Sequence, residues 1–357
     1  MENGNAPGNP GKIAKILTIA ALILLGLFVA AVIGIGICWN SLLGQMRTAQ
    51  QPGNEPQTPV VAPFPEATAA VAAPAETEAA PQPTESITNV LLIGQNQNLA
   101  DSMILVSLNR ETGCLSMISF LRDLYVTIPA YAGHGADKNR INAAYYWGKR
   151  WSGTAEGGME LLRSCIRENF GIPVEHCIAV DFDVFTQVID ILGGVEIDLT
   201  EEEARYLTRS VGYVGSFQPG RQTLSGREAL AYSRIRKIDS DIQRTSRQRR
   251  VLSSLVEKCR SRNLIQLYEV ASAVVPMVTT DMTQGQITQY LLELLPMLPR
   301  LEIQSTLCPV DNATLPGSCW DKKVKIGGTD CAVIACNAAR NQAYLRDFLG
   351  YPPEDSG

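Results

Sequence analysis

A basic stretch, residues 232–248, contains the residue types and spacing best suited to phosphate chemistry, in a chain of 357 residues with a formal net charge of −5. Arg234 and Arg236 lie two positions apart, so both side chains of an extended segment point to one face. A guanidinium group is planar and holds phosphate oxygens through two parallel hydrogen bonds. The pair therefore predicts a phosphate or pyrophosphate site, the alternative being a solvated charged surface.

The end of this stretch continues as a helical pattern with polar residues at its start. The polar members recur at i, i+3 and i+4 and are Arg244, Arg247 and Gln248, and the stripe continues in the apolar Val251, Leu252 and Leu255. A helix N-terminus favours anions in its own right, so the pattern brings guanidinium groups and a helix end to one site. Asp239 and Asp241 precede the helix and are expected to cap it, with a role in binding metal or orienting the arginines as the alternative. Arg249 and Arg250 fall outside the stripe and are expected to be solvated.

Composition argues against several other kinds of function. The sequence isoelectric point is about 5.3, whereas binding to duplex nucleic acid needs a broad basic surface. Only two histidines occur, which argues against a histidine triad or a zinc site with several histidines. The nine cysteines form no C-x-x-C pair, so a zinc ribbon or a thioredoxin-type motif is not indicated. Their pairing stays open, with Cys308 to Cys319 as one example.

The N-terminal part predicts a membrane anchor and a tether. Residues 16–39 contain no charge over 24 positions, which is long enough for a single-pass, uncleaved signal anchor to cross a bilayer. Lys12 and Lys15 precede them, so the positive-inside rule keeps residues 1–15 in the cytoplasm and places the main domain outside the cell membrane. Residues 40–87 are rich in Pro, Ala, Thr and Glu and are expected to form a disordered linker.

From residue 88 onward, short apolar runs alternate with segments of helical periodicity. We expect strands at residues 89–94, 103–108, 114–119, 125–128, 177–182, 195–199 and 301–307. We expect helices at residues 155–169, 184–192, 201–209, 225–232, 241–262, 264–277, 283–298 and 329–349. This alternation predicts an α/β fold with a central mixed β-sheet flanked by helices. The catalytic core spans residues 88–262, and residues 263–357 form a helical and strand extension that either completes the sheet or caps it.

Five further segments carry motifs that agree with the basic stretch. They are ADSM at residues 100–103, SFLRD at 119–123, RINAAY at 140–145, VDFDVF at 180–185 with DILGGV at 190–195, and LSGREALAY at 224–232. In this order, together with the arginines, they resemble the LytR-CpsA-Psr (LCP) family of bacterial membrane-anchored phosphotransferases over residues 89–262. The combination is far more specific than any single short motif.

The resemblance implies a transferase of cell wall biogenesis. Such an enzyme moves a glycopolymer, for example teichoic acid or capsular polysaccharide, from a polyprenyl-pyrophosphate carrier in the lipid membrane onto peptidoglycan, and pyrophosphatase activity is compatible with the same site. In the family the pyrophosphate lies among arginines with a magnesium ion (Mg²⁺), and the prenyl chain enters an apolar tunnel between sheet and helices. Phosphoryl transfer depends on positioning and charge neutralisation, which an arginine cluster supplies.

The same resemblance assigns roles to individual residues. The pyrophosphate-binding set is Arg122, Arg140, Arg234, Arg236, Arg244, Arg247 and Gln248. Arg122, Arg234 and Arg236 are also expected to act in catalysis. Asp123 is expected to be the base for the sugar hydroxyl, and a simple ion pair between Asp123 and an arginine is the alternative.

The predicted metal site departs from the family pattern. Asp101 is expected to bind Mg²⁺, but the family's Gly-x-Asp after the first strand is Gly94-Gln95-Asn96 here. Asn96, the second predicted ligand, offers a neutral carbonyl oxygen, a weaker partner than carboxylate for a hard cation. Leu99 stands where the family often has an arginine. The alternative function is a non-catalytic protein that binds polyprenyl pyrophosphate or cell wall through a degraded metal site. A transcriptional regulator is a further alternative, against which the sequence shows no basic helix that could read DNA.

Overall fold

The computed structural model describes residues 47–48, 86–96, 99–210 and 217–352. All of them belong to one unit, residues 47–357. The predicted anchor and nearly all of the predicted linker lie outside the described residues. Within the described part of the chain, no helix has the length and apolar character needed to cross a bilayer.

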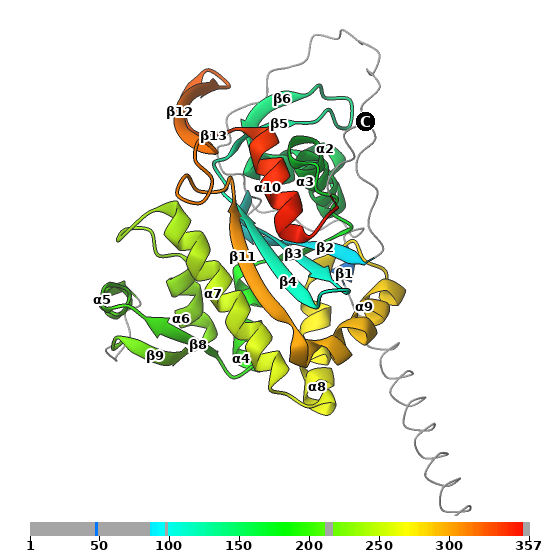
Figure 1. Ribbon diagram of the computed structural model, residues 1–357, viewed down its shortest axis with the longest axis vertical. Coiled ribbons are helices and arrows are strands. Elements are labelled where there is room, and N and C mark those ends of the chain that lie inside the picture. The colour runs from blue at the N-terminus through cyan, green and yellow to red at the C-terminus, as the bar shows by residue number, and fades with distance from the viewer. Residues whose placement is uncertain (1–46, 49–85, 97–98, 211–216, 353–357) are drawn as a thin grey trace, which may run out of the picture. The chain divides into compact units, whose positions relative to one another are not determined.

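A seven-stranded mixed sheet forms the centre of this unit (Figure 1), with the order β1-β10-β7-β2-β3-β4-β11. The strand bounds are β1 Arg47–Thr48, β2 Ile87–Asn96, β3 Leu99–Asn109, β4 Cys114–Phe120, β7 His176–Val180, β10 Thr279–Thr280 and β11 Glu302–Cys308. Strand β2 runs parallel to β7 and antiparallel to β3, and β11 adds to β4 in parallel. The predicted mixed sheet is confirmed, and the C-terminal extension completes it.

Helices cover both faces of the sheet (Figure 1). One layer consists of α2 Asn142–Ser152, α3 Ala155–Phe170 and α10 Ala338–Leu349, and the other includes α7 Asp241–Arg260, α8 Leu264–Val274 and α9 Gln284–Met297. Side chains of a strand alternate between faces, so neighbouring residues of β3 enter different cores. Leu105 packs in the large core with Leu91, whereas Val106 packs in a smaller cluster with Val256 of α7.

A further core packs against helix α7, which also packs against the sheet. It is built from α4 Phe182–Ile191, β8 Val195–Leu199, α5 Glu201–Ser210, β9 Gly220–Leu224 and α6 Gly226–Ser233. Strands β8 and β9 form a separate antiparallel pair. Ile197, Tyr232 and Val251 are buried together in this core. Because Val251 and Val256 enter different clusters, α7 connects this core to the sheet.

Residues 329–349 do not form the single helix that the sequence predicts. The remaining elements are β5 Tyr125–Ile128, β6 Asp137–Arg140, β12 Cys319–Ile326, β13 Thr329–Cys336 and the 3₁₀ turns η1 Val275–Met277 and η2 Leu298–Arg300. Strand β13 pairs with β12 across a turn at Gly327 and Gly328, both at positive φ. Asn337 then caps α10 by accepting a hydrogen bond from the Arg340 N–H. The prediction was wrong because this segment becomes a strand only through its partner β12.

Two more differences concern a helix and the cysteines. Helix α2 was not predicted, because its buried residues 143–148 form a continuous run rather than an i, i+3, i+4 pattern. The eight described cysteines are free thiols, so the example pairing of Cys308 with Cys319 is not formed. The other predicted strands and helices are present with bounds shifted by a few residues.

Candidate active site

Strands β3 and β4 bring two predicted site segments together. The strands are antiparallel, with Ile104 opposite Ser119, so the start of β3 lies beside the end of β4. Asp101 lies near the start of β3, and Arg122 follows the end of β4. Their side chains meet, with Arg122 Nη1 at 3.5 Å from Asp101 Oδ1.

An alternating row of charges extends from this ion pair. Arg122 Nε lies 3.4 Å from Asp123 Oδ2, and Arg140 Nε lies 3.4 Å from the other oxygen of the same carboxylate. Both Nε atoms are buried, yet neither makes a hydrogen bond. Charge attraction therefore holds the two guanidinium groups on either side of the Asp123 carboxylate.

The C-terminal hairpin holds this row in place. The Ile334 N–H donates to the Asp123 carbonyl oxygen at 3.0 Å. Arg140 Nη2 donates to the carbonyl oxygen of Ala332 at 3.1 Å. Sequence reasoning missed this support, because the contacts join distant parts of the chain and β13 was predicted as part of a helix.

The start of α7 differs from the predicted capping arrangement. Ser240 is the N-cap, and its hydroxyl accepts a hydrogen bond from the Gln243 N–H. Asp239 and Asp241 are therefore free for other partners. Asp241 Oδ2 accepts a hydrogen bond from Arg244 Nη2 at 2.9 Å.

Asp241 joins the start of α7 to the row of charges on the sheet. We call the combined set the charged cluster, and its members are Asp101, Arg122, Asp123, Arg140, Arg236, Asp241 and Arg244. Burial raises the pKa of the Asp241 carboxyl group. The nearby Arg122 and Arg236 lower the pKa, and the carboxylates of Asp123 and Asp101 raise it. The net direction is upward, so Asp241 is a third carboxylate of the site, which agrees with the alternative role beside the arginines rather than with a cap.

Arg234 and Arg236 show the alternating exposure that their spacing predicts. Both are exposed, and Ile235 between them is buried. The Arg234 guanidinium lies 4.6 Å from the centroid of the Phe182 ring. The Arg236 side chain is 42% exposed, and its Nε lies 3.8 Å from Asp241 Oδ1. Both groups are open to a ligand.

Arg247 occupies a different environment from the one predicted. Its side chain is 4% exposed, and Nε donates to Glu203 Oε1 at 2.8 Å. Nη1 donates to the Ile235 carbonyl oxygen at 3.1 Å, and Nη2 pairs with Asp239. Because these protein groups already use its donors, we revise the predicted pyrophosphate contact: Arg247 fixes the loop that carries Arg234.

Gln248 and Arg244 complete the helical part of the predicted site. Gln248 Oε1 accepts a hydrogen bond from the Ser102 hydroxyl at 3.0 Å, next to Asp101 in β3. Arg244 is 3% exposed, and its Nε is buried without a hydrogen-bond partner, while Nη2 is bound to Asp241. Six of the seven predicted pyrophosphate-binding residues therefore lie in or beside the charged cluster, and Arg247 supports it from within.

The donor atoms fit a hard cation that is held partly by its ligand. Asp101 and Asp241 contribute carboxylates to one cluster, where negative charge accumulates. In the described residues, no group of three or more His, Cys, Asp or Glu side chains is arranged to hold a metal ion. Mg²⁺ commonly takes one or two carboxylates and completes its shell with phosphate oxygens and water. Asn96 Nδ2 donates to Asp101 Oδ2 at 3.3 Å, so here Asn96 orients that carboxylate, and its role as a ligand stays a prediction.

Comparisons with known proteins agree with this arrangement. The model of the LytR_cpsA_psr family matches residues 66–323. The polyisoprenyl-teichoic acid–peptidoglycan teichoic acid transferase TagT of Bacillus subtilis is 34% identical over 175 residues, which cover 49% of this chain and 50% of the relative. A transferase of the same description, TagU of Oceanobacillus iheyensis, is 32% identical over 207 residues, which cover 56% and 60%. The matched region thus spans about half of each of these relatives.

A solved structure shares the fold over a larger part of its length. It is described as TagT bound to LIIa-WTA and aligns with a TM-score of 0.58 at 26% sequence identity. The alignment covers 74% of this chain and 92% of that chain.

Proposed function

Because this chain belongs to the LytR-CpsA-Psr family, we propose that it transfers a glycopolymer from a polyprenyl-pyrophosphate carrier onto peptidoglycan. The observation that carries the proposal is the contact of the exposed Arg236 with Asp241, which lies in the field of Arg122 and the sheet carboxylates. The exposed Arg234 lies two positions earlier on the same loop. The relatives named as teichoic acid transferases support the same chemistry. The polymer of this chain is accordingly an anionic glycopolymer of the teichoic acid type.

The arginines bind the pyrophosphate in this proposal. Arg234 and Arg236 are open and contribute planar donor pairs, which match phosphate oxygens. Arg122 and Arg140 add positive charge, and their Nε atoms are held beside the Asp123 carboxylate. Charge that develops on the phosphate oxygens during transfer is therefore met by donors that the fold holds in position.

The transfer itself needs one proton acceptor. The hydroxyl oxygen of the peptidoglycan sugar attacks the phosphorus next to the polymer, and the bond from that phosphorus to the bridging oxygen breaks. Polyprenyl phosphate leaves, and the hydroxyl proton moves to a carboxylate, for which we retain Asp123. Arg122 and Arg140 orient that carboxylate from both sides. Mg²⁺, held by Asp101 and substrate phosphate oxygens, would supply further charge neutralisation.

An apolar layer supports binding of the prenyl chain. Half-buried residues of β3, Val106 and Leu108, face Val256 of α7 and Leu267 of α8 between the sheet and its helices. This chemistry suits a hydrocarbon chain next to a pyrophosphate group. A carrier of this kind resides in a bilayer, which agrees with a membrane anchor at residues 16–39 and an extracellular domain.

The test is transfer by the purified full chain in detergent with a polyprenyl-pyrophosphate-linked polymer and peptidoglycan. Arg234→Ala removes an open donor pair, and we expect the rate to fall about 100-fold or more. The matched control is Arg205→Ala, an exposed arginine paired with Glu201 at i,i+4 on α5. Equal rates for Arg234→Ala and the wild type would contradict the proposal.

A second function is favoured by one observation, the neutral Asn96 beside Asp101. If the metal site is too weak for turnover, the protein binds polyprenyl pyrophosphate without transferring its polymer. The discriminating measurement is Mg²⁺-dependent transfer by the wild type and by Asn96→Asp. Turnover by the wild type excludes the binding-only function, whereas turnover only after the substitution supports it.

A further inference from the structure

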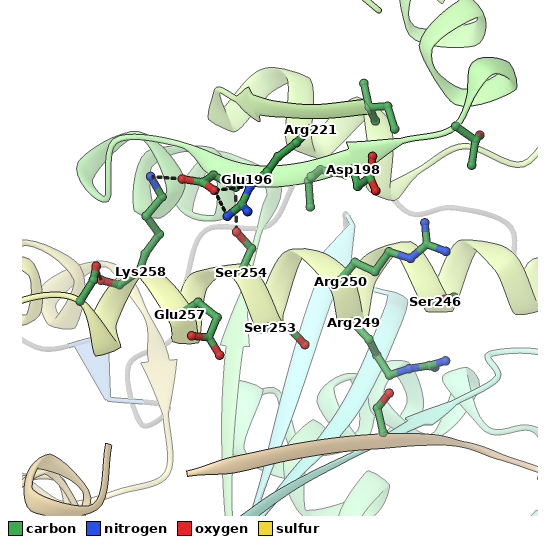
Figure 2. A pocket seen from close by; sticks show the side chains of 15 residues that line it. Glu196, Asp198, Arg221, Ser246, Arg249, Arg250, Ser253, Ser254, Glu257 and Lys258 are labelled. Carbon is green, nitrogen blue, oxygen red and sulfur yellow. Dashed lines mark hydrogen bonds and ion pairs between the residues drawn. The ribbon is translucent and has the colours of Figure 1, made fainter. Parts of the chain in front are cut away.

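A groove of about 890 Å³ runs along α7, apart from the charged cluster (Figure 2). Helix α7 forms its base, β8 contributes one wall, and Ser305 of β11, the last strand of the described sheet, contributes another part. Arg249 extends from α7 toward β11, whereas Arg250 extends toward the strand of Asp198 (Figure 2). The groove therefore exposes two arginines of α7 to different surroundings.

Most charges in this groove are neutralised within the protein. Glu196 pairs with Arg221, and its other oxygen lies 3.8 Å from Lys258 Nζ. Arg250 Nη1 lies 3.6 Å from Glu203 Oε1. These groups have counter-charges and need no ligand.

Arg249 is a basic residue of the groove with an unpaired nitrogen, and it is half-buried rather than fully solvated as predicted. Its Nη1 atom is buried and has no hydrogen-bond partner in the described structure. Burial, followed by the charge of Arg250, lowers the pKa of Arg249 to about 10. An unpaired polar nitrogen is costly to bury in a folded protein, so an anionic ligand that pairs with this atom would stabilise the position.

We propose that Arg249 anchors a phosphodiester group of the glycopolymer donor, which makes the groove a second anion subsite beside the pyrophosphate site. This inference rests on the proposed transfer function. Arg249 follows Arg244 by five residues on α7, a helix rise of roughly 7.5 Å. The same five residues turn the side chain by about 140° around the helix axis, so in this proposal one polymer extends around α7 from the charged cluster to this groove.

The lining of the groove carries both signs of charge, and its carboxylates are Glu196, Asp198 and Glu257. The part around Arg249 contains hydrogen-bond donors suited to phosphate. Ser246, Ser253 and Ser305 line it together with Arg249 and can donate hydroxyl hydrogen bonds. None of its described lining residues is aromatic, so stacking on sugar rings has no platform here. The two free oxygens of a phosphodiester match the donor fork of a guanidinium group. A carboxylate of the acceptor peptide is the competing ligand that the experiment must separate.

The first experiment measures binding of a synthetic glycerol phosphate oligomer to the full chain in detergent by calorimetry. We expect Arg249→Gln to weaken binding about ten-fold or more, as for loss of a charge-assisted hydrogen-bond pair. Arg205→Gln changes net charge equally at an exposed position outside the groove and is expected to bind like the wild type. Equal affinity of Arg249→Gln and the wild type would overturn the proposal, as would stronger displacement of the probe by an acidic wall peptide.

A second experiment compares two donors, one whose polymer carries phosphodiesters and one whose saccharide carries none. The wild type is expected to prefer the phosphodiester donor in kcat/KM, and Arg249→Gln is expected to lose that preference about ten-fold. A preference that is unchanged in Arg249→Gln counts against the subsite. If the wild type turns over neither donor, the proposed function fails, and the calorimetric experiment still decides the role of Arg249.

Thermal unfolding separates a binding role from a packing role. An unpaired buried guanidinium opposes folding, so Arg249→Gln is expected to unfold at the wild-type temperature or above it. The oligomer is expected to raise the unfolding temperature of the wild type more than that of Arg249→Gln. If Arg249→Gln lowers the unfolding temperature, Arg249→Lys, which keeps the charge, is measured as well. An Arg249→Lys protein that folds and binds the oligomer supports the subsite. An Arg249→Lys protein that folds but does not bind the oligomer overturns it.

Discussion

Arg247 and Arg236 belong to one basic stretch, yet they are packed in opposite ways. Arg247 is 4% exposed and uses its donors on Glu203, Asp239 and a backbone carbonyl. Arg236 is 42% exposed, and Asp241 lies 3.8 Å away. A guanidinium whose donors are all satisfied by protein holds the structure together, whereas one with free donors can bind a ligand. Residue type and spacing do not distinguish the two cases; the partners do.

Arg249 stands between these extremes. It is half-buried, and its buried Nη1 atom lacks a partner. Burial of a polar atom and the presence of a hydrogen-bond partner for it are separate properties. A polar atom that is buried without a partner marks a candidate ligand site. Substitution of Arg247 should therefore lower the free energy of unfolding, whereas substitution of Arg236 or Arg249 should weaken substrate binding or transfer.

The largest effect is expected at Arg247. Arg247→Met leaves the buried carboxylate of Glu203 without its main partner, and we expect a loss of about 3–5 kcal/mol in the free energy of unfolding. Chemical denaturation of the full chain measures it. Adding Glu203→Gln removes the stranded charge, so the double variant should recover part of the loss. A change below about 1 kcal/mol for Arg247→Met would mean that the interior pair is not structural.

Arg236→Ala is expected to show the opposite pattern. Its open side chain contributes little to folding, so the unfolding free energy should change by no more than about 0.5 kcal/mol. Transfer should fall about 10²- to 10³-fold, because a donor for the charged phosphate oxygens is lost. Transfer kinetics and denaturation of the same preparation test the comparison. A large loss of stability without a larger loss of transfer would remove the distinction between the two arginines.

The fold was largely predictable because its signals are local. The β3–β4 hairpin follows from two apolar runs joined by the turn at residues 109–113, and α3 follows from its period and from Gly171 after its end. Residues 329–349 could not be assigned in this way. Strand β13 exists because β12 pairs with it, and pairing between strands is not encoded in either segment alone.

The site was predictable as a set of residues but not as a set of contacts. Spacing identified Arg234 and Arg236, whose exposure is as expected. It also assigned Arg247 to the ligand, because nothing local indicates that Glu203 of α5 lies 2.8 Å away. Capping was the first interpretation of Asp241 and orientation of the arginines the second, since only the folded chain brings Asp241 near the carboxylates on the sheet.

The smallest expected effect concerns the partner of Arg236 and has a defined sign. Burial raises the pKa of Asp241 above its usual 3.8, so the native state binds this proton more tightly than the unfolded state does. Stability contributed by this group therefore falls as pH rises through the interval between the two values. Asp241→Asn lacks that titration, so its unfolding free energy relative to the wild type should improve from about pH 3 to pH 7.

Glu293 provides a control of opposite sign. Hydrogen bonds from Gln289 and Arg110 lower the pKa of its carboxyl group, so its stability contribution is present above the usual 4.5 and is lost as pH falls through the lowered value. Glu293→Gln should therefore worsen relative to the wild type as pH rises, while Asp241→Asn improves. If both variants drifted in the same direction, the carboxylate beside Arg236 would not be a group that folding disfavours. Asp241 beside Arg236 and Glu203 beside Arg247 would then differ only in their exposure to solvent.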